Sequence, residues 1–257
     1  MSSDTQIHIL DGGTIEILDW SIYDPAAPPH SRRTLSVPVY LVVHDGRTLV
    51  WDTGLGDRLA GADPMLVADH ALFTVAEPLA KQLRAAGYPA DEIELLALSH
   101  FHPDHVGNVG LFTRSTLVSQ SDEYDVAFGP DARDHGYVPD DYAVIGDLPT
   151  KLLDGDEDVF GDGAVVIKRL PGHTVGSQSL LVRLPERGSV LISGDLVHSM
   201  ENWENRVVPP VLNYLPEESA RSLEAAAALL HEESADLWVQ HDHPQYLALR
   251  AESRIFQ

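Results

Sequence analysis

The sequence predicts an α/β fold, organised as one domain over residues 1–257. Apolar runs of strand length, such as Leu35–His44, alternate along the chain with segments of helical spacing, such as Glu217–His231. The two halves of the chain share a rhythm in which strand-rich segments come first and helix-bearing segments follow. A chain of 257 residues, of which 44% are hydrophobic, is long enough for one large domain with a real core.

The elements can be assigned in chain order from periodicity and turn residues. In the N-terminal part we expect a hairpin over residues 6–22 around Asp11-Gly12-Gly13, followed by a strand pair over Leu35–His44 and Thr48–Asp52. We then expect a loop over residues 55–74, a helix over Val75–Gly87 and a strand over Ile93–Leu98. In the middle of the chain we expect a short helix after Pro103, a strand over Ser115–Val118, a helix over Ser121–Val126 and an acidic loop over Gly129–Asp141. In the C-terminal part we expect two strands within Val159–Leu170 and a strand pair over Ser179–Arg183 and Ser189–Ser193. The last two expected elements are a helix over Glu217–His231 and a strand over Asp236–Gln240.

The composition excludes several classes of partner. With 17 basic and 40 acidic residues the formal net charge is −23, so nucleic acid and anionic membrane surfaces would be repelled. The chain has no cysteine, which rules out disulfides and thiolate ligands. No run approaches the roughly 20 apolar residues that span a bilayer. The N-terminal residues lack the basic and apolar regions of a signal peptide, so we expect a cytoplasmic protein.

The stretch Leu95–Asn108 concentrates the residues with metal-binding chemistry. An apolar strand pattern leads directly into His100, His102, Asp104 and His105. Side chains two apart in an extended segment point to the same face, so His100 and His102 should project together. Pro103 suits the first position of a helix, which would bring Asp104 and His105 to the same place from another direction. Imidazole and carboxylate groups at this density predict two divalent metal ions of the zinc type.

These residues resemble a known family. His100-Phe101-His102-Pro103-Asp104-His105 matches the H-x-H-x-D-H signature of the metallo-β-lactamase superfamily. Pro171–Gly176 resembles the second motif of that superfamily, P-G-H-T-x-G, and Gly194-Asp195 resembles the third. The resemblance covers nearly the whole chain and implies a four-layer αββα sandwich.

The resemblance also implies a set of metal ligands. One ion is expected on His100, His102 and His173, and the other on Asp104, His105 and His241, with Asp195 between the two. Two remaining assignments are alternatives. His241 is preferred to His243 because it directly follows an apolar strand, with Asp242 or His243 available to orient it. Asp52, in Asp52-Thr53-Gly54, is expected to support the site or form a turn rather than bind a metal.

Within the superfamily the chain looks most like the N-acyl homoserine lactonase branch. That branch opens a lactone ring with a hydroxide that bridges two metal ions, most often Zn, although Mn, Fe or Co also suit such ligands. Asp104 is then expected to carry a proton to the ring oxygen. His198 follows the bridging aspartate by three residues, where many members have tyrosine. Its imidazole could act on the substrate carbonyl or the leaving oxygen, or it could simply pack beside the metals.

Other functions share the same predicted ligands. A phosphotriesterase of the methyl-parathion-hydrolase type fits the site, as does a thioester hydrolase, although the C-terminal region offers only Arg250 and Arg254 for an acidic substrate. A non-enzymatic binding protein would be expected to lack ligands. The acyl pocket could be lined by residues near the motifs, among them Phe101, Met65, Phe73, Met200 and Trp203, and His135 is expected to be a solvated loop residue. The lactone is the expected partner, and the protein could be a monomer or a homodimer.

Overall fold

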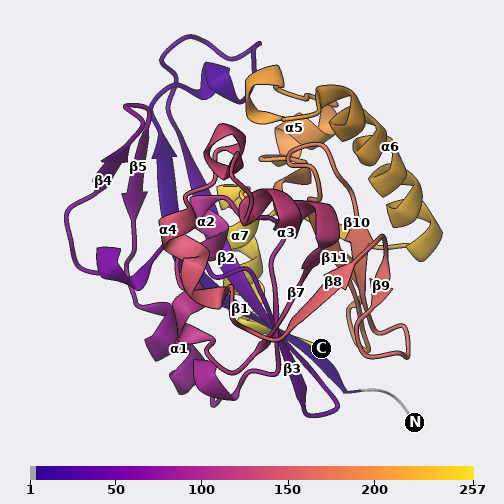
Figure 1. Ribbon diagram of the computed structural model, residues 1–257. Helices are drawn as coiled ribbons and strands as arrows, with labels where there is room; N and C mark the ends of the chain where they lie inside the picture. Colours follow the sequence, from indigo (N-terminus) through magenta and orange to yellow (C-terminus); the bar gives the residue numbers. More distant parts are fainter. Residues whose placement is uncertain (1–3) are drawn as a thin grey trace.

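Two β-sheets face each other in the computed structural model, which describes residues 4–257 (Figure 1). The larger sheet has the strand order β4-β5-β1-β2-β3-β6-β7-β8, and β14 pairs with the free side of β1. Its strands are β1 Thr5–Ile17, β2 Arg33–His44, β3 Arg47–Trp51, β4 Met65–Val67, β5 Ala71–Thr74, β6 Leu95–Ala97, β7 Thr116–Gln120, β8 Thr150–Leu153 and β14 Ile255–Phe256. The smaller sheet has the order β13-β12-β11-β10-β9, with β9 Glu157–Asp158, β10 Val165–Arg169, β11 Gln178–Leu184, β12 Gly188–Ile192 and β13 Asp236–Trp238.

Helices cover the outer face of each sheet, and the last helix packs instead against the apolar residues between the sheets. They are α1 Leu79–Ala85, α2 Pro103–Val106, α3 Ser121–Ala127, α4 Pro139–Tyr142, α5 Met200–Glu204, α6 Pro216–Glu233 and α7 His243–Glu252. In Figure 1, α6 runs along the outside of the smaller sheet beside β10 and β11, while α1 to α4 lie toward the larger sheet. Buried apolar residues of α1 and α2 pack on the larger sheet, and those of α6 pack on the smaller one. A third cluster fills the space between the sheets. The expected four-layer αββα sandwich is therefore confirmed.

The sheet topology places the metal motif at a strand end. β3, β6 and β7 run parallel, and Leu49–Trp51 pairs with Leu95–Ala97. Their carboxyl ends therefore reach the same edge of the larger sheet, where the chain leaves β3 at Asp52 and β6 at Leu98. At the facing edge, β12 ends beside Ser193 and β13 ends beside Val239. Segments far apart in sequence thus meet at one place, as the bond from Trp51 Nε1 to Gln240 Oε1 shows across 189 residues.

The structure corrects the expected hairpin over residues 6–22. β1 is one strand, and its pairing with β2 shifts register between Asp11 and Thr14, so Gly12-Gly13 forms a bulge rather than a turn. Glycine is required there because a Cβ on Gly12 would lie 2.4 Å from the carbonyl oxygen of Val37. A Gly-Gly pair is typical of both features, and only the continuous pairing with β2 distinguishes them.

Other predicted elements are confirmed with shifted bounds. The strand pair about Asp45-Gly46, the helix that follows β7 and the long helix α6 are where the sequence predicts them. The helix expected from Val75 begins at Leu79, after Pro78. The expected loop over residues 55–74 is wrong in part, because it contains the edge hairpin β4–β5. α4, β8, α5, α7 and β14 were not predicted from the sequence, and α4 begins within the expected acidic loop over Gly129–Asp141. Only one strand, β10, lies within Val159–Leu170, because the strand before it, β9, ends at Asp158.

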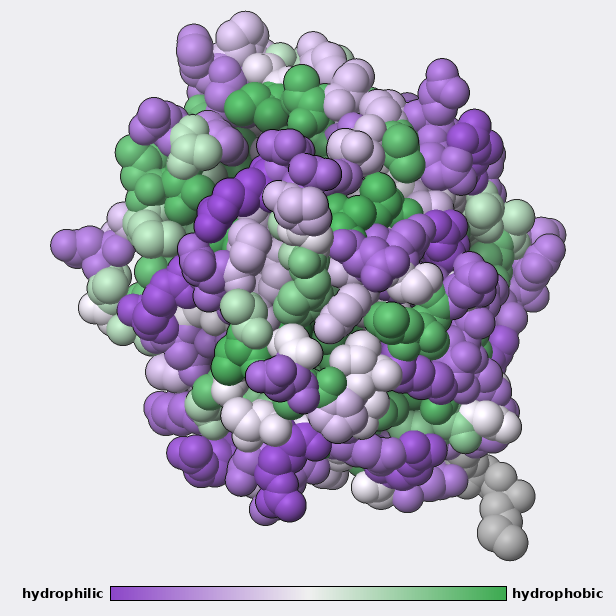
Figure 2. Space-filling model, in the orientation of Figure 1, coloured by the Kyte–Doolittle hydropathy of each residue, from purple (hydrophilic) through white to green (hydrophobic). Residues whose placement is uncertain are grey.

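The surface agrees with the acidic composition. Figure 2 shows hydrophilic side chains over most of the face that it presents, with hydrophobic side chains in separate patches. In the described part of the chain, no helix is both long enough and apolar enough to cross a membrane. The prediction about a signal peptide falls in part on residues 1–3, which lie outside the described residues.

Candidate metal centre

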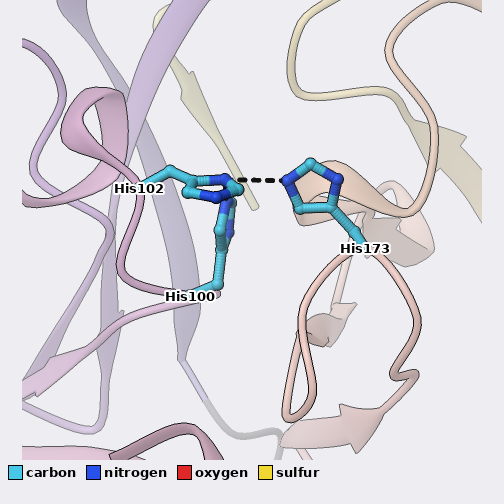
Figure 3. Close-up of side chains that lie close together, drawn as sticks. All are labelled: His100, His102 and His173. Atoms are coloured by element: carbon cyan, nitrogen blue, oxygen red, sulfur yellow. Dashed lines mark hydrogen bonds between the residues drawn. The ribbon is translucent and has the colours of Figure 1, made fainter. Parts of the chain in front are cut away.

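Three histidines from two distant loops converge at the edge between the sheets. His102 Nδ1 lies 2.9 Å from His100 Nε2 and 2.9 Å from His173 Nε2. Figure 3 shows His102 and His173 pointing toward each other from opposite sides, with His100 directly below His102. The potential ligand atoms of these three residues lie within 4.8 Å of one another. The structure thus brings together the three residues expected to hold one ion.

A second set lies directly beside the first. Asp104 Oδ2 is 3.6 Å from His105 Nε2 and 3.5 Å from His241 Nε2. Asp104 and His105 come from α2, which begins at Pro103 as the sequence predicts. The start of α2 directs Asp104 and His105 toward His241, which follows β13. The potential ligand atoms of Asp104, His105 and His241 form a second compact group. His243, the alternative to His241, instead contacts Ser36 Oγ through Nδ1 at 2.8 Å.

The two sets share the carboxylate of Asp195. Its Oδ2 lies 3.4 Å from His173 Nε2 and 3.9 Å from His100 Nε2. Its other oxygen, Oδ1, lies 2.9 Å from His241 Nε2 and 3.2 Å from His105 Nε2. One oxygen therefore faces each set, which is the arrangement of a carboxylate that bridges two cations.

Hydrogen bonds to the far ring nitrogens orient most of these histidines. His102 Nε2 contacts the carbonyl oxygen of His135 at 3.1 Å, and His241 Nδ1 contacts that of Ser36 at 2.7 Å. His105 Nδ1 lies 2.8 Å from Asp52 Oδ2. A donor bond from one ring nitrogen leaves a lone pair on the other, which is the usual support of a metal-bound histidine.

Asp52 is the centre of a buried network beneath the site. It is fully buried and accepts hydrogen bonds from Ser99 N at 2.6 Å, Ser99 Oγ at 2.9 Å and Gln240 Nε2 at 2.6 Å. The backbone of Asp52 has φ 57°, a left-handed conformation that aspartate tolerates better than most residues. Its contact with His105 agrees with the interpretation that Asp52 supports the site rather than binding metal.

A second buried carboxylate, Glu123 of α3, joins the two histidine loops. Its Oε1 accepts from Phe101 N at 3.2 Å and from the Tyr137 hydroxyl at 2.6 Å, and its Oε2 accepts from Gly176 N at 2.9 Å. Burial raises the pKa of Glu123, while these hydrogen bonds oppose the shift. Phe101 lies between two of the histidines and Gly176 follows the third, so this side chain holds both loops in register. The sequence offers no signal for this role.

The chemistry of the convergent groups fits a pair of divalent cations. His105 Nε2 and Asp195 Oδ1 are buried and make no hydrogen bond to the described residues. Burial lowers the pKa of His100 and His173 well below the ordinary value, so both rings are neutral and present lone pairs. Burial alone would also lower the pKa of His105, but Asp104, Asp195 and Asp52 raise it well above the ordinary value. A cation in place of that proton would satisfy the same carboxylates.

His198 and Tyr23 form an adjoining wall. His198 is buried, and its Nε2 lies 3.3 Å from Asp195 Oδ2. The ring of Tyr23 meets it edge to face, with 5.0 Å between ring centroids. Burial raises the pKa of Tyr23, and the carboxylates of Asp104 and Asp195 raise it further, so its phenol keeps the proton at neutral pH. Tyr23 was missed by sequence reasoning because it lies in a proline-rich loop without a motif.

An open cavity of about 470 Å³ leads from the surface to these groups. In the described chain, no lysine or arginine lines it. The walls combine polar and apolar side chains: Ile15, Tyr23, Leu35, Asp134, His135, Val211, Leu212, Asn213 and Tyr214, with the metal-facing residues at the base. A cavity whose described lining contains no lysine or arginine suits an uncharged substrate better than an anionic one.

The structure corrects three expectations about the site. Phe101, Met65, Phe73, Met200 and Trp203 do not line it; Phe101, for example, is fully buried in the core. His135 is not a solvated loop residue, because its ring packs on that of Tyr214 with 4.1 Å between centroids and its carbonyl oxygen contacts His102. Neither Asp242 nor His243 contacts His241 through its side chain; Asp242 instead caps α7 by accepting from Gln245 N.

Comparison with known families decides the classification. Residues 32–235 match the profile of the family described as the metallo-beta-lactamase superfamily. The chain belongs to this superfamily. Its fold and the convergent His and Asp groups suggest a dinuclear divalent-metal site.

Several proteins that are similar to this chain are named as N-acyl homoserine lactonases or hydrolases. The chain is 30% identical over 219 residues to N-acyl homoserine lactonase AttM of Rhizobium radiobacter, covering 81% of this chain and 82% of the relative. It is 27% identical over 240 residues to N-acyl homoserine lactonase AiiA of Bacillus thuringiensis subsp. kurstaki, covering 91% and 92%. A solved N-acyl homoserine lactone hydrolase, with the product N-hexanoyl-L-homoserine bound at its catalytic metal center, superposes with a TM-score of 0.82 at 26% identity, covering 96% and 97%.

Proposed function

We propose that this protein is a dinuclear-metal hydrolase that opens the lactone ring of N-acyl homoserine lactones or related neutral lactones. The observation that carries the proposal is the position of Asp195, which turns one oxygen to each histidine set at the base of a cavity whose described lining contains no lysine or arginine. The named lactonase relatives, and the product bound in one of their solved structures, support the substrate class.

The proposed ligands follow the two geometric sets. His100, His102 and His173 would hold one ion, Asp104, His105 and His241 the other, and Asp195 would contact both. We propose zinc, because neutral imidazoles and carboxylates suit it, with manganese, iron or cobalt as the alternatives for the same donors. When bound, such a pair supplies Lewis acidity toward a carbonyl and lowers the pKa of water toward neutrality.

The chain itself would orient the ester and move the proton. Asp104 lines the cavity and is partly exposed, so its carboxylate can reach both the base of the cavity and a bound substrate. We assign it the transfer of a proton to the ring oxygen that leaves as an alkoxide. His198 faces Asp195 Oδ2 from the cavity wall and is assigned a hydrogen bond to the oxygen that becomes negative during attack.

No lysine or arginine of the described chain lines the cavity, and this distinguishes thioester hydrolysis from phosphotriester hydrolysis as alternative reactions. A thioester hydrolase that recognises a carboxylate-bearing thiol would favour a free cation near the metals. Arg32 and Arg33, which line an adjoining cavity, are paired with Glu16 and Glu201. A neutral phosphotriester meets the same electrostatic requirement as a lactone, so phosphotriester hydrolysis is retained as the second candidate.

The test is a substrate panel on protein of known metal content. Base consumption would be followed with N-acyl homoserine lactones of different chain lengths, a neutral phosphotriester and an anionic thioester. We expect ring opening to exceed the other two activities, and to be lost on chelation and restored by added zinc. Turnover of the phosphotriester alone would favour the second candidate, and no turnover of any lactone by protein with two metal equivalents would refute the proposal.

A further inference from the structure

Tyr23 lines the cavity, and the proposed chemistry gives it no role. It follows the short 3-10 helix η1, Trp20–Ile22, and its ring stacks on Trp20 with 4.8 Å between centroids and 6° between planes. Its carbonyl oxygen accepts from Asn202 Nδ2 at 3.2 Å, which ties the loop to α5. The backbone of Tyr23 is therefore tied to α5, and its ring is held between Trp20 and His198.

The position of Tyr23 relative to the metal-facing residues is specific. His198 lies between Tyr23 and the base of the cavity, since its ring is 5.5 Å from that of His173 and 6.0 Å from that of His241. The Tyr23 side chain therefore lines the cavity one ring farther out than His198. A group that meets the phenol belongs to a part of the substrate next to the reacting ester, not to the ester itself.

The hydroxyl groups of the tyrosines around the site are used differently. Tyr137 donates to Glu123 Oε1 and Tyr142 donates to the carbonyl oxygen of Ala127, each at 2.6 Å and each inside the protein. The phenol of Tyr23 instead borders the cavity that holds Asp104 and Asp195. It is a neutral O–H donor beside carboxylates, which are acceptors, so it adds a donor to a wall rich in acceptors.

We propose that Tyr23 is a positioning residue that donates a hydrogen bond from its hydroxyl to the exocyclic amide carbonyl of an N-acylamino lactone. This inference rests on the proposed function and adds a reason for selectivity. The amide nitrogen is bonded to the ring carbon next to the ester carbonyl, so two atoms separate the amide carbonyl from the ester carbonyl, which matches the outward displacement of Tyr23 from the metal-facing residues. Tyr23 therefore selects lactones that bear an acylamino group over plain lactones of the same ring size.

The test compares Tyr23→Phe with the wild-type protein, both loaded with metal. Phenylalanine keeps the contacts with Trp20 and His198 and removes only the hydroxyl. A hydrogen bond made away from the reacting atoms contributes equally to ground and transition states, so we expect KM for N-hexanoyl homoserine lactone to rise about 5- to 10-fold with kcat almost unchanged. The kinetics of γ-butyrolactone, which lacks the amide, should change less than about twofold.

A binding measurement gives a readout that does not depend on turnover. The γ-lactam analogue of N-hexanoyl homoserine lactone has the same two carbonyls but resists ring opening. Its Kd, measured by calorimetry, should rise by the same factor in Tyr23→Phe. Tyr88→Phe is the matched control, because Tyr88 packs against His8 and the core, outside the cavity. That control should leave both KM and Kd unchanged.

The outcomes separate this inference from the proposed function. If wild-type protein hydrolyses no lactone, the proposed function is refuted. If it does so and Tyr23→Phe matches it within twofold on both the acylamino lactone and the lactam, only the role of Tyr23 is refuted. Equal losses on γ-butyrolactone, or loss of bound metal, would show that Tyr23 supports the site as a whole and would also overturn the inference.

Discussion

Asp52 Oδ2 and His105 Nδ1 lie 2.8 Å apart, and both side chains are fully buried. The pair joins the end of β3 to α2 and turns the Nε2 atom of His105 toward Asp195. A buried carboxylate in this position raises the basicity of the histidine and holds its tautomer. The geometry of the proposed second ion therefore depends on a residue that does not face it.

Asp52→Asn should weaken metal binding by about 10- to 100-fold, because asparagine has one acceptor oxygen for the four donors that surround Asp52. Competition with a chromophoric chelator measures this change. Asp45→Asn is the control, since Asp45 also has a left-handed backbone, with φ 48°, but lies exposed in the β2–β3 turn. An affinity within twofold of the wild type would show that Asp52 contributes only to folding.

Glu123→Gln should destabilise the fold by about 1–3 kcal/mol, because the amide nitrogen must face one of three buried donors that now meet a carboxylate oxygen. Denaturant unfolding of the metal-loaded protein measures the free energy. Asp125→Asn, on the exposed side of the same helix, is the control. If the two variants unfold at the same denaturant concentration, the bridge between the histidine loops carries no net stability.

Gly172→Ala should impair both folding and metal binding. Gly172 has φ +135°, and a Cβ there would lie 2.3 Å from Ser219 N, in the first turns of α6. We expect a loss of several kcal/mol, since the backbone that carries His173 must move. Gly188→Ala is the matched control, because it has φ +92° but open space around the Cβ. Thermal melting and metal content measure both effects, and equal melting temperatures in the two variants would exclude the close contact as the cause.

The pH dependence of stability should contain a contribution from His8. Burial lowers its pKa from the ordinary value of 6.5, and its Nε2 makes no hydrogen bond within the described chain. A base with a depressed folded-state pKa stabilises the protein above its unfolded pKa, and this stability is lost as the pH falls toward the folded-state pKa. Stability should therefore decline below about pH 6.5, by at most about 1.4 kcal/mol per pH unit for this one group.

His8→Phe removes that titration and keeps a ring beside Tyr88, which His8 meets edge to face with 5.6 Å between centroids. Unfolding free energies measured between pH 5 and 7.5 should fall less steeply in the variant. His30→Gln is the control, because the side chain of His30 is 89% exposed. Identical slopes for His8→Phe and the wild type would show that His8 is protonated equally in the folded and unfolded chains.

The local sequence was sufficient to predict those helices and strands whose apolar spacing or terminal proline is visible within a short segment. The strand before His100, the helix start at Pro103 and the long helix α6 follow from apolar spacing and from proline. The bulge in β1 could not be predicted, because a glycine pair suits both a turn and a bulge, and the pairing with β2 decides. The edge hairpin β4–β5 was missed because its strands are only three and four residues long.

The sequence by itself determined the type of chemistry, because it places closely spaced histidines and aspartates at the end of a strand. Only the tertiary structure decided which groups, distant in sequence, support the candidate metal centre. Ser36 orients His241 across 205 residues, Glu123 joins two histidine loops, and Tyr23 borders the cavity. Periodicity reports on neighbours along the chain, whereas these contacts depend on the order of strands in two sheets and on how the sheets pack.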